Sequence, residues 1–149
     1  MHRHLKPGYG HIEQVEIDMR PRCDDGTLTH KPDGSLPDIV RWFNYLEDAT
    51  TRAHRSIVYG HDARLLLAAQ GFVDIEEEVI RLPVNPWPSD PHQKEIGRWY
   101  NLGLTEGLEA TSLGPFTRCF NWPVRDVKMM VEEVKTILCN KRIHVYNNM

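Results

Sequence analysis

Near the start of the chain, the stretch Leu5-Lys6-Pro7-Gly8-Tyr9-Gly10 runs directly into His11-Ile12-Glu13-Gln14-Val15-Glu16-Ile17-Asp18. The first segment predicts a turn, because proline and glycine favour the backbone angles that turns require. The second has the composition of a strand, so we predict a strand over residues 11–18. A polar loop with two Asp-Gly turns follows over residues 20–35. This loop is long enough to suggest a functional role.

Apolar residues recur at helical spacing in later segments of the chain. They predict helices over residues 36–52, 62–70, 92–108 and 123–139. A strand region is expected over residues 72–82, and a further strand-like run begins at Ile143. Gly114-Pro115 should interrupt the segment that follows the third helix. The order strand, helices, strand, helices, start of strand is one half of a doubly wound α/β domain, so residues 1–149 are predicted to form a single partial domain.

Composition excludes several classes of function. The chain has 149 residues, 40% of them hydrophobic, and a net charge of −3, so it lacks the basic surface that nucleic-acid binding needs. No stretch approaches 18 apolar residues and no apolar segment follows the N-terminus, which argues against a membrane span and against secretion. Three widely spaced cysteines argue against a disulfide framework or a zinc site, and we expect no metal.

The richest candidate for a binding site is the loop Asn85-Pro86-Trp87-Pro88 with the helix that follows it. Prolines fix the loop, while Trp87, Trp99 and Tyr100 offer flat apolar surfaces with polar edges. These aromatic residues suit the wall of a pocket for a substrate or a partner. The alternative is a rigid lid that covers the edge of the sheet.

Two glutamates on the first strand are the other candidates. Glu13 and Glu16 lie beside the long loop, and in a central strand an unpaired carboxylate would be costly to bury. They therefore predict a salt bridge to a neighbouring helix or, as the alternative, a contact with a substrate or partner. Glu76, Glu77 and Glu78 would point to alternate faces of a strand and predict a solvated edge.

Eight motifs along the chain, taken together, point to a known family. They are Leu5-Lys6-Pro7-Gly8-Tyr9-Gly10, Glu13-Gln14-Val15-Glu16-Ile17-Asp18, Pro21-Arg22, Asp25-Gly26-Thr27-Leu28, Asn85-Pro86-Trp87-Pro88, Lys94-Glu95-Ile96-Gly97-Arg98-Trp99, Gly107-Leu108-Glu109-Ala110 and Phe116-Thr117-Arg118. With these motifs the chain resembles the LaeA-type methyltransferases of the velvet complex, which regulate secondary metabolism and development in filamentous fungi. The resemblance implies the C-terminal half of a class I, Rossmann-like methyltransferase domain, with an incomplete sheet and flanking helices. The turn at residues 5–10 would lead into the fifth strand of a seven-stranded sheet.

The same resemblance implies S-adenosylmethionine as the cofactor of the complete protein, velvet-domain proteins as partners, and the nucleus as the location, with the cytoplasm as the alternative. The glycine-rich loop and the acidic residue that hold this cofactor in the family have no counterpart here, so we expect no cofactor-binding residues and no enzymatic activity of this chain alone. Its exposed sheet edge would allow self-association. The alternative hypothesis is a non-catalytic module that docks a velvet-type protein or a full-length methyltransferase.

Overall fold

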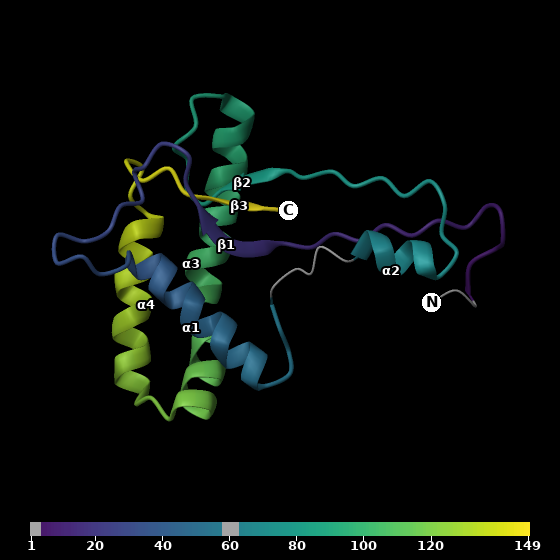
Figure 1. The fold of residues 1–149 in the computed structure, drawn as a ribbon. Coiled ribbons are helices and arrows are strands. Elements are labelled where there is room, and N and C mark those ends of the chain that lie inside the picture. Colours follow the sequence, from purple (N-terminus) through teal and green to yellow (C-terminus); the bar gives the residue numbers. More distant parts are fainter. Residues whose placement is uncertain (1–3, 58–62) are drawn as a thin grey trace.

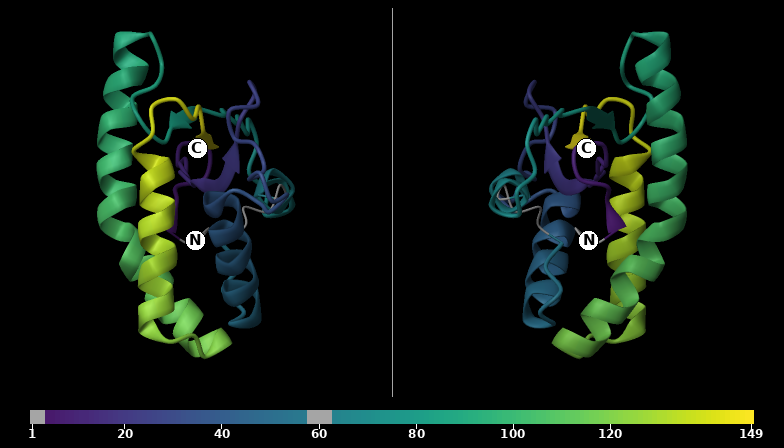
Figure 2. Two further views of the ribbon diagram at one scale, coloured as in Figure 1. Left: turned by 90° about the vertical axis from the view of Figure 1, so that its left-hand side faces the viewer. Right: turned by 90° about the vertical axis from the view of Figure 1, so that its right-hand side faces the viewer.

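The computed structural model describes residues 4–57 and 63–149 as a mixed α/β fold (Figure 1). In chain order its elements are β1 (Asp18–Arg22), α1 (Asp38–Arg52), α2 (Ala63–Ala69), β2 (Arg81–Pro83), α3 (Pro91–Phe120), α4 (Val124–Leu138) and β3 (Tyr146–Asn148). Helices α1, α3 and α4 pack against one another, and the strands lie against this group through contacts of β1 with α1 and of β2 with α3 (Figure 2). Among the described helices, none is both long and apolar enough to span a membrane.

The core lies between the three long helices. Helices α1 and α4 each bury one apolar stripe, which is why their bounds fall within two residues of the ranges expected from periodicity. A buried hydrogen bond of 2.8 Å runs from Trp42 Nε1 on α1 to Ser112 Oγ on α3, so the indole N–H is satisfied inside the core. The fully buried members of the core, by residue volume, include Phe43, Phe116, Leu46, Leu138, Val84, Val127, Val131, Val134 and Val145.

Helix α2 differs from the other helices. It spans Ala63–Ala69 within the expected 62–70, whose first residue lies outside the described part of the chain. None of its residues is buried, and the side chains of Leu65 and Leu66 are 69% and 65% exposed. The helix therefore has an apolar surface that no other described element covers.

The third helix is longer than predicted. It runs unbroken from Pro91 to Phe120, so both the expected end at residue 108 and the expected interruption at Gly114-Pro115 were wrong. A proline inside a helix removes one backbone hydrogen bond, but tertiary packing outweighs that loss here. Phe116 follows the proline directly and is fully buried against the rings of Tyr45 and Trp122. The helix ends where Asn121 adopts a left-handed conformation with φ of 55°.

The sheet has the order β1-β3-β2, and β3 pairs antiparallel with both neighbours. Strands β1 and β2 therefore run parallel to each other. Their carboxyl ends and the start of β3 lie at the same edge, because Tyr146 is the register partner of both Arg22 and Pro83. This edge carries the site described below.

Both predicted strand ranges were too long or displaced. The strand expected over 11–18 is instead β1 at Asp18–Arg22, and of the region expected over 72–82 only Arg81–Pro83 is strand. A strand needs a neighbour to bond with, and β3 reaches only as far as these residues. Just before β2 and just after β3, the backbones of Ile80 and Met149 exchange two hydrogen bonds of 2.7 and 2.8 Å. Residues 5–17 and 72–79 continue as two long segments that extend away from the helices (Figure 1).

Candidate functional site

A cavity of about 340 Å³ lies at the sheet edge where β1 and β2 end and β3 begins. Open α/β sheets bind their ligands beyond the carboxyl ends of their parallel strands, which makes this cavity a candidate functional site. The cavity draws on the loop after β1, on β2 and the loop that follows it, and on the chain leading into β3. It is lined by Asp24, Asp25, Arg81, Pro83, Trp87, Pro88, Gln93, His144 and Tyr146.

At the centre of this site, Asp25 Oδ2 contacts His144 Nδ1 in a short hydrogen bond. The other carboxylate oxygen of Asp25 accepts hydrogen bonds from Cys23 Sγ at 3.1 Å and from the backbone and hydroxyl of Thr27 at 3.0 and 2.8 Å. The bonds from Cys23 and Thr27, together with His144, hold the pKa of the Asp25 carboxyl well below its ordinary value. Because Nδ1 is engaged with Asp25, Nε2 is the ring nitrogen of His144 that remains to hydrogen-bond a ligand.

Trp87 forms one wall of the site. Its indole stacks on the His144 ring with centroids 4.7 Å apart and an interplanar angle of 23°. Its Nε1 donates a hydrogen bond of 3.1 Å to the backbone oxygen of Val145. The loop that carries Trp87 is held in turn by buried Asn85, whose Nδ2 donates to the backbone oxygens of Asn140 and Ile143, each at 3.2 Å. The aromatic wall is therefore fixed before any ligand arrives.

A second carboxylate, Asp24, ties the site to the sheet. It accepts hydrogen bonds from the Tyr146 hydroxyl at 2.7 Å and from Arg81 Nη1 at 2.6 Å. The Tyr146 hydroxyl and the Arg81 guanidinium lower the pKa of Asp24, and the same bond to a carboxylate raises the pKa of Tyr146. Arg81 also lies 4.6 Å from the centre of the Tyr146 ring, where it makes a cation–π contact. The rings and carboxylates of this site thus already hold one cation.

The structure does not bring the five candidate residues together. Glu13 and Glu16 are exposed, line a different and larger cavity, and form no ion pair with any residue of the described chain. Trp87 alone lies in the site. Trp99 is 67% exposed and donates a hydrogen bond only to Glu95, while Tyr100 donates one to Asn147 Oδ1 at 3.0 Å, and burial raises its pKa to about 12.

The residues that sequence reasoning missed are Asp24, Asp25, Arg81, His144 and Tyr146. The Asp24-Asp25-Gly26 turn was visible as part of a long polar loop, which was the available signal for the first two. Asp25 and His144 are 119 residues apart in the sequence, and only the pairing of β3 with β1 brings them into contact. Among the described residues, no cluster of histidine, cysteine and acidic side chains is arranged to hold a metal ion.

Acid is expected to lower the stability of the chain through the Asp25 carboxylate. The pKa of Asp25 is lowered in the folded state, so its contribution to the free energy of unfolding is present above about pH 4 and is lost as the pH falls through the folded value. We expect the urea midpoint to fall between pH 5 and pH 2, and to fall less in Asp25→Asn, because an amide does not titrate there. Asp74→Asn, at an exposed aspartate outside the site, is the control and should keep the full dependence on pH. If the urea midpoint of Asp25→Asn depends on pH as strongly as that of the unchanged chain, titration of the Asp25 carboxylate does not contribute to stability.

The described fold is that of a mixed α/β protein, with a cavity at the carboxyl ends of β1 and β2. No family model and no solved structure matches the chain. It is 57% identical over 149 residues to "Secondary metabolism regulator LAE1" of Cochliobolus heterostrophus, a match that covers 99% of this chain and 47% of that protein. It is 43% identical to "Secondary metabolism regulator laeA" of Aspergillus flavus and 40% identical to "Protein-methionine methyltransferase laeA" of Emericella nidulans, covering 97% of this chain and 37% of each relative.

The chain is thus a homologue of the LaeA-type secondary metabolism regulators over nearly its whole length, and it spans between 37% and 47% of the relatives compared.

A methyltransferase relative implies S-adenosylmethionine, and the described residues do not fit this cofactor. In open α/β sheets, a cofactor that carries a nucleoside is held at a glycine-rich turn between a strand and the helix that follows it. In the described chain, the connection from β1 to α1 has glycines only at Gly26 and Gly34, and the connection from β2 to α3 has none. Neither connection carries the closely spaced glycines of such a turn.

Proposed function

We propose that this chain is the acceptor-binding part of a methyltransferase-type regulator of fungal secondary metabolism and development that acts in the nucleus. Methyl transfer from S-adenosylmethionine would belong to a polypeptide that also supplies the cofactor pocket. Homology to relatives named as secondary metabolism regulators and as a methyltransferase supports this proposal. The observation that carries it is the Asp25–His144–Trp87 cluster at the carboxyl edge of the strands.

The order of the strands agrees with this proposal. If β1 occupies the fifth position of a seven-stranded sheet, as the resemblance implies, then β2 and β3 are the sixth and seventh strands. The observed order β1-β3-β2 then corresponds to five, seven, six, and the free edge of β1 faces the position of the missing strands. The site would lie on the same edge of the complete sheet as a cofactor bound by its first half.

A protein methionine side chain is the proposed acceptor, since one relative is named a protein-methionine methyltransferase. A thioether makes favourable contacts with aromatic rings, and Trp87 supplies such a ring at the wall of the cavity. Asp24, Asp25 and the Tyr146 ring attract positive charge, as the bound Arg81 side chain shows. A methylated, cationic sulfur would therefore find a favourable electrostatic environment in this cavity.

A non-catalytic docking module, bound to a velvet-domain protein or to a full-length methyltransferase, is the second candidate. The uncovered leucines of α2 favour it, because a surface of this kind attracts a partner. If the chain is only a docking module, it would bind its partner, and methyl transfer would not depend on the cluster around His144.

The test replaces the matched segment of Cochliobolus heterostrophus LAE1 with this chain and follows the transfer of labelled methyl groups from S-adenosylmethionine to protein. We expect Trp87→Ala and His144→Ala each to lower this transfer about tenfold, which corresponds to roughly 1.4 kcal/mol of lost binding or positioning. Trp99→Ala removes a tryptophan from the exposed surface and should leave the rate unchanged.

Two outcomes decide between the candidates. If the hybrid protein transfers methyl groups at the same rate with and without Trp87 and His144, the cavity is not the acceptor site. If the 149-residue chain by itself binds S-adenosylmethionine saturably in a calorimetric titration, the assignment of cofactor binding to another part of the polypeptide is wrong.

A further inference from the structure

The guanidinium of Arg81, at the start of β2, is bound at the wall of the cavity around His144 by two groups from other segments. Its Nη1 lies 2.6 Å from Asp24 Oδ2, and its Cζ lies 4.6 Å from the centre of the Tyr146 ring. A carboxylate beside an aromatic ring is an arrangement that recognises the cationic groups of ligands. We call the Asp24 carboxylate and the Tyr146 ring the cation subsite, which a side chain of the chain itself occupies here.

The bond between Arg81 and the cation subsite can be replaced at little cost. The side chains of Arg81 and Asp24 are 63% and 60% exposed. Ion pairs exposed to this extent contribute little to stability, because water screens the charges and two flexible side chains have to be ordered. The arginine side chain can turn into the solvent without any movement of the sheet. A cation that belongs to a ligand can therefore take its place.

The cation subsite does not need Arg81 to keep its shape. Tyr146 lies on the central strand β3 and is only 8% exposed. Its hydroxyl donates a hydrogen bond of 2.7 Å to Asp24 Oδ1, whereas Arg81 contacts Oδ2, the other oxygen of the same carboxylate. Departure of the guanidinium thus leaves the bond between Tyr146 and Asp24 intact. The carboxylate and the ring are in place before a ligand arrives.

The distance between the cation subsite and the aromatic wall of the cavity matches an extended peptide. His144 and Tyr146 both line the cavity, whereas Val145 between them is fully buried. Their side chains therefore lie on one side of the backbone, as alternate residues of an extended chain do. Such side chains are separated by roughly 6–7 Å along the chain. A ligand peptide in the same conformation presents its own alternate side chains at this spacing.

We propose that the cavity takes an extended peptide in which an arginine or lysine lies two residues from the methionine, and that this basic side chain replaces Arg81 on Asp24 and Tyr146. The methionine packs against Trp87, next to His144. The inference rests on the proposed function for the identity of the methionine, but binding at the cation subsite does not require methyl transfer. The basic residue gives the peptide its preference for this cavity.

The experiment uses the whole 149-residue chain and the fluorescently labelled peptide Arg-Ala-Met-Ala-Arg, which has an arginine two positions before and two positions after the methionine. The comparison peptide carries citrulline in place of both arginines and so keeps their shape without their charge. Fluorescence anisotropy gives the Kd of each peptide. We expect the arginine peptide to bind about tenfold more tightly than the citrulline peptide.

Two substitutions test the cation subsite from opposite sides. Asp24→Asn should abolish the preference for the arginine peptide, while Arg81→Gln removes the competing cation and should tighten binding of that peptide about threefold to tenfold. Arg98→Gln is the matched control, because Arg98 forms a similarly exposed ion pair with Glu95 on α3, and it should leave both affinities unchanged. Weaker binding of the arginine peptide to Arg81→Gln than to the unchanged chain would overturn the proposal.

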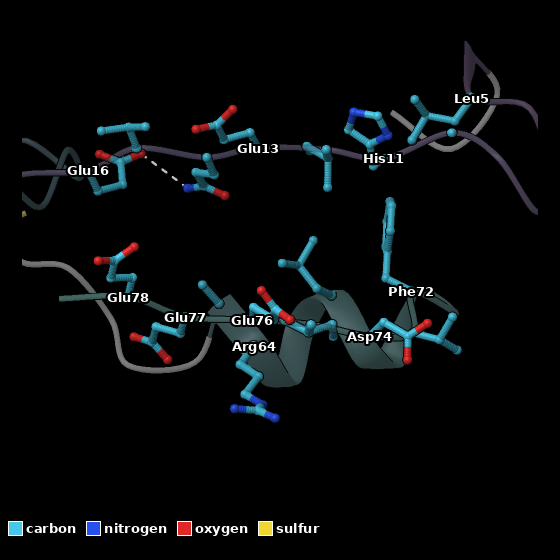
Figure 3. A pocket seen from close by; sticks show the side chains of 18 of the residues that line it. Leu5, His11, Glu13, Glu16, Arg64, Phe72, Asp74, Glu76, Glu77 and Glu78 are labelled. Atoms are coloured by element: carbon cyan, nitrogen blue, oxygen red, sulfur yellow. Dashed lines mark hydrogen bonds between the residues drawn. The ribbon is translucent and has the colours of Figure 1, made fainter.

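The larger cavity, of about 880 Å³, provides a control for attraction by charge alone. Figure 3 shows the glutamates on its two walls, which are Glu13, Glu16, Glu76, Glu77 and Glu78. They attract any basic peptide over some distance. Glu77→Gln removes one negative charge, as Asp24→Asn does, and should leave the preference for the arginine peptide intact. An equal loss of this preference in both variants would show that the peptide responds only to net charge, and would overturn the proposal.

This result can be separated from that of the methyl-transfer test. Norleucine in place of methionine removes the thioether from both peptides and leaves their charge unchanged. A preference for arginine that persists with the norleucine peptides supports the cation subsite even if the hybrid protein transfers no methyl groups. Equal binding of the arginine and citrulline peptides would overturn the cation subsite and would leave the proposed function as it stands.

Discussion

Gly97→Ala is expected to lower the free energy of unfolding by about 1–3 kcal/mol, because the site has no room for a methyl group. A Cβ atom at this position would lie 2.5 Å from the backbone oxygen of Asn85, 2.9 Å from its carbonyl carbon and 3.2 Å from the nitrogen of Pro86. These neighbours are all backbone atoms, so no rotation of a side chain can relieve the clash. The loop that positions Trp87 would have to move away from α3.

Urea unfolding of the variant at neutral pH measures this effect, and Gly103→Ala is the matched control. Gly103 lies on the same helix, and a methyl group added there would meet nothing within 4 Å, so its replacement should raise the stability by about 0.5–1 kcal/mol through the better helix propensity of alanine. The two substitutions are chemically identical and are expected to have opposite signs. A stabilising Gly97→Ala would mean that α3 and the Asn85 loop are not in close contact.

Phe116→Ala is expected to cost about 3–5 kcal/mol, the largest effect of any substitution proposed for this chain. Phe116 is fully buried, and its ring lies 6.3 Å from that of Tyr45, 6.2 Å from that of Phe120 and 5.4 Å from that of Trp122. Its removal leaves a cavity among rigid aromatic rings, which collapse poorly into the space. It also removes the contact that holds α3 helical past Pro115.

Circular dichroism during urea unfolding gives the stability of this variant, and Met129→Ala on α4 is the control. Met129 is 57% exposed, so the control should change the stability by no more than about 0.5 kcal/mol. We further expect the Phe116→Ala variant to lose helix content at the end of α3 before the whole chain unfolds. A cost below about 1 kcal/mol would show that the aromatic cluster does not anchor this helix.

The helices that sequence analysis predicted well are those whose burial follows one face. Helix α1 buries Ile39, Trp42, Phe43, Leu46 and Ala49, and this spacing is visible in the sequence before any contact is known. The prediction for α3 was wrong at its end, because the effect of Pro115 depends on the packing of Phe116 against residues far away in the sequence. The predictions for the strands were wrong for a related reason. Residues 11–17 have the composition of a strand, but composition does not say whether a neighbour lies beside them.

The candidate site was predictable only in part. Trp87 could be singled out because prolines on either side make its loop rigid, and that property is local. His144 and Tyr146 looked like ordinary residues of a late strand, and Asp24 and Asp25 like a polar turn. Their chemistry arises from hydrogen bonds that join segments more than a hundred residues apart.

Strand β3 is short, but its central position makes its few residues important to the whole sheet. Strands β1 and β2 do not pair with each other, so they belong to one sheet only through β3, which consists of Tyr146, Asn147 and Asn148. The same short segment follows directly on His144. Proteolytic cleavage after Arg142 would therefore separate β1 from β2 and remove the imidazole of His144 from the cavity at the same time, so the sheet and the candidate site depend on the same segment.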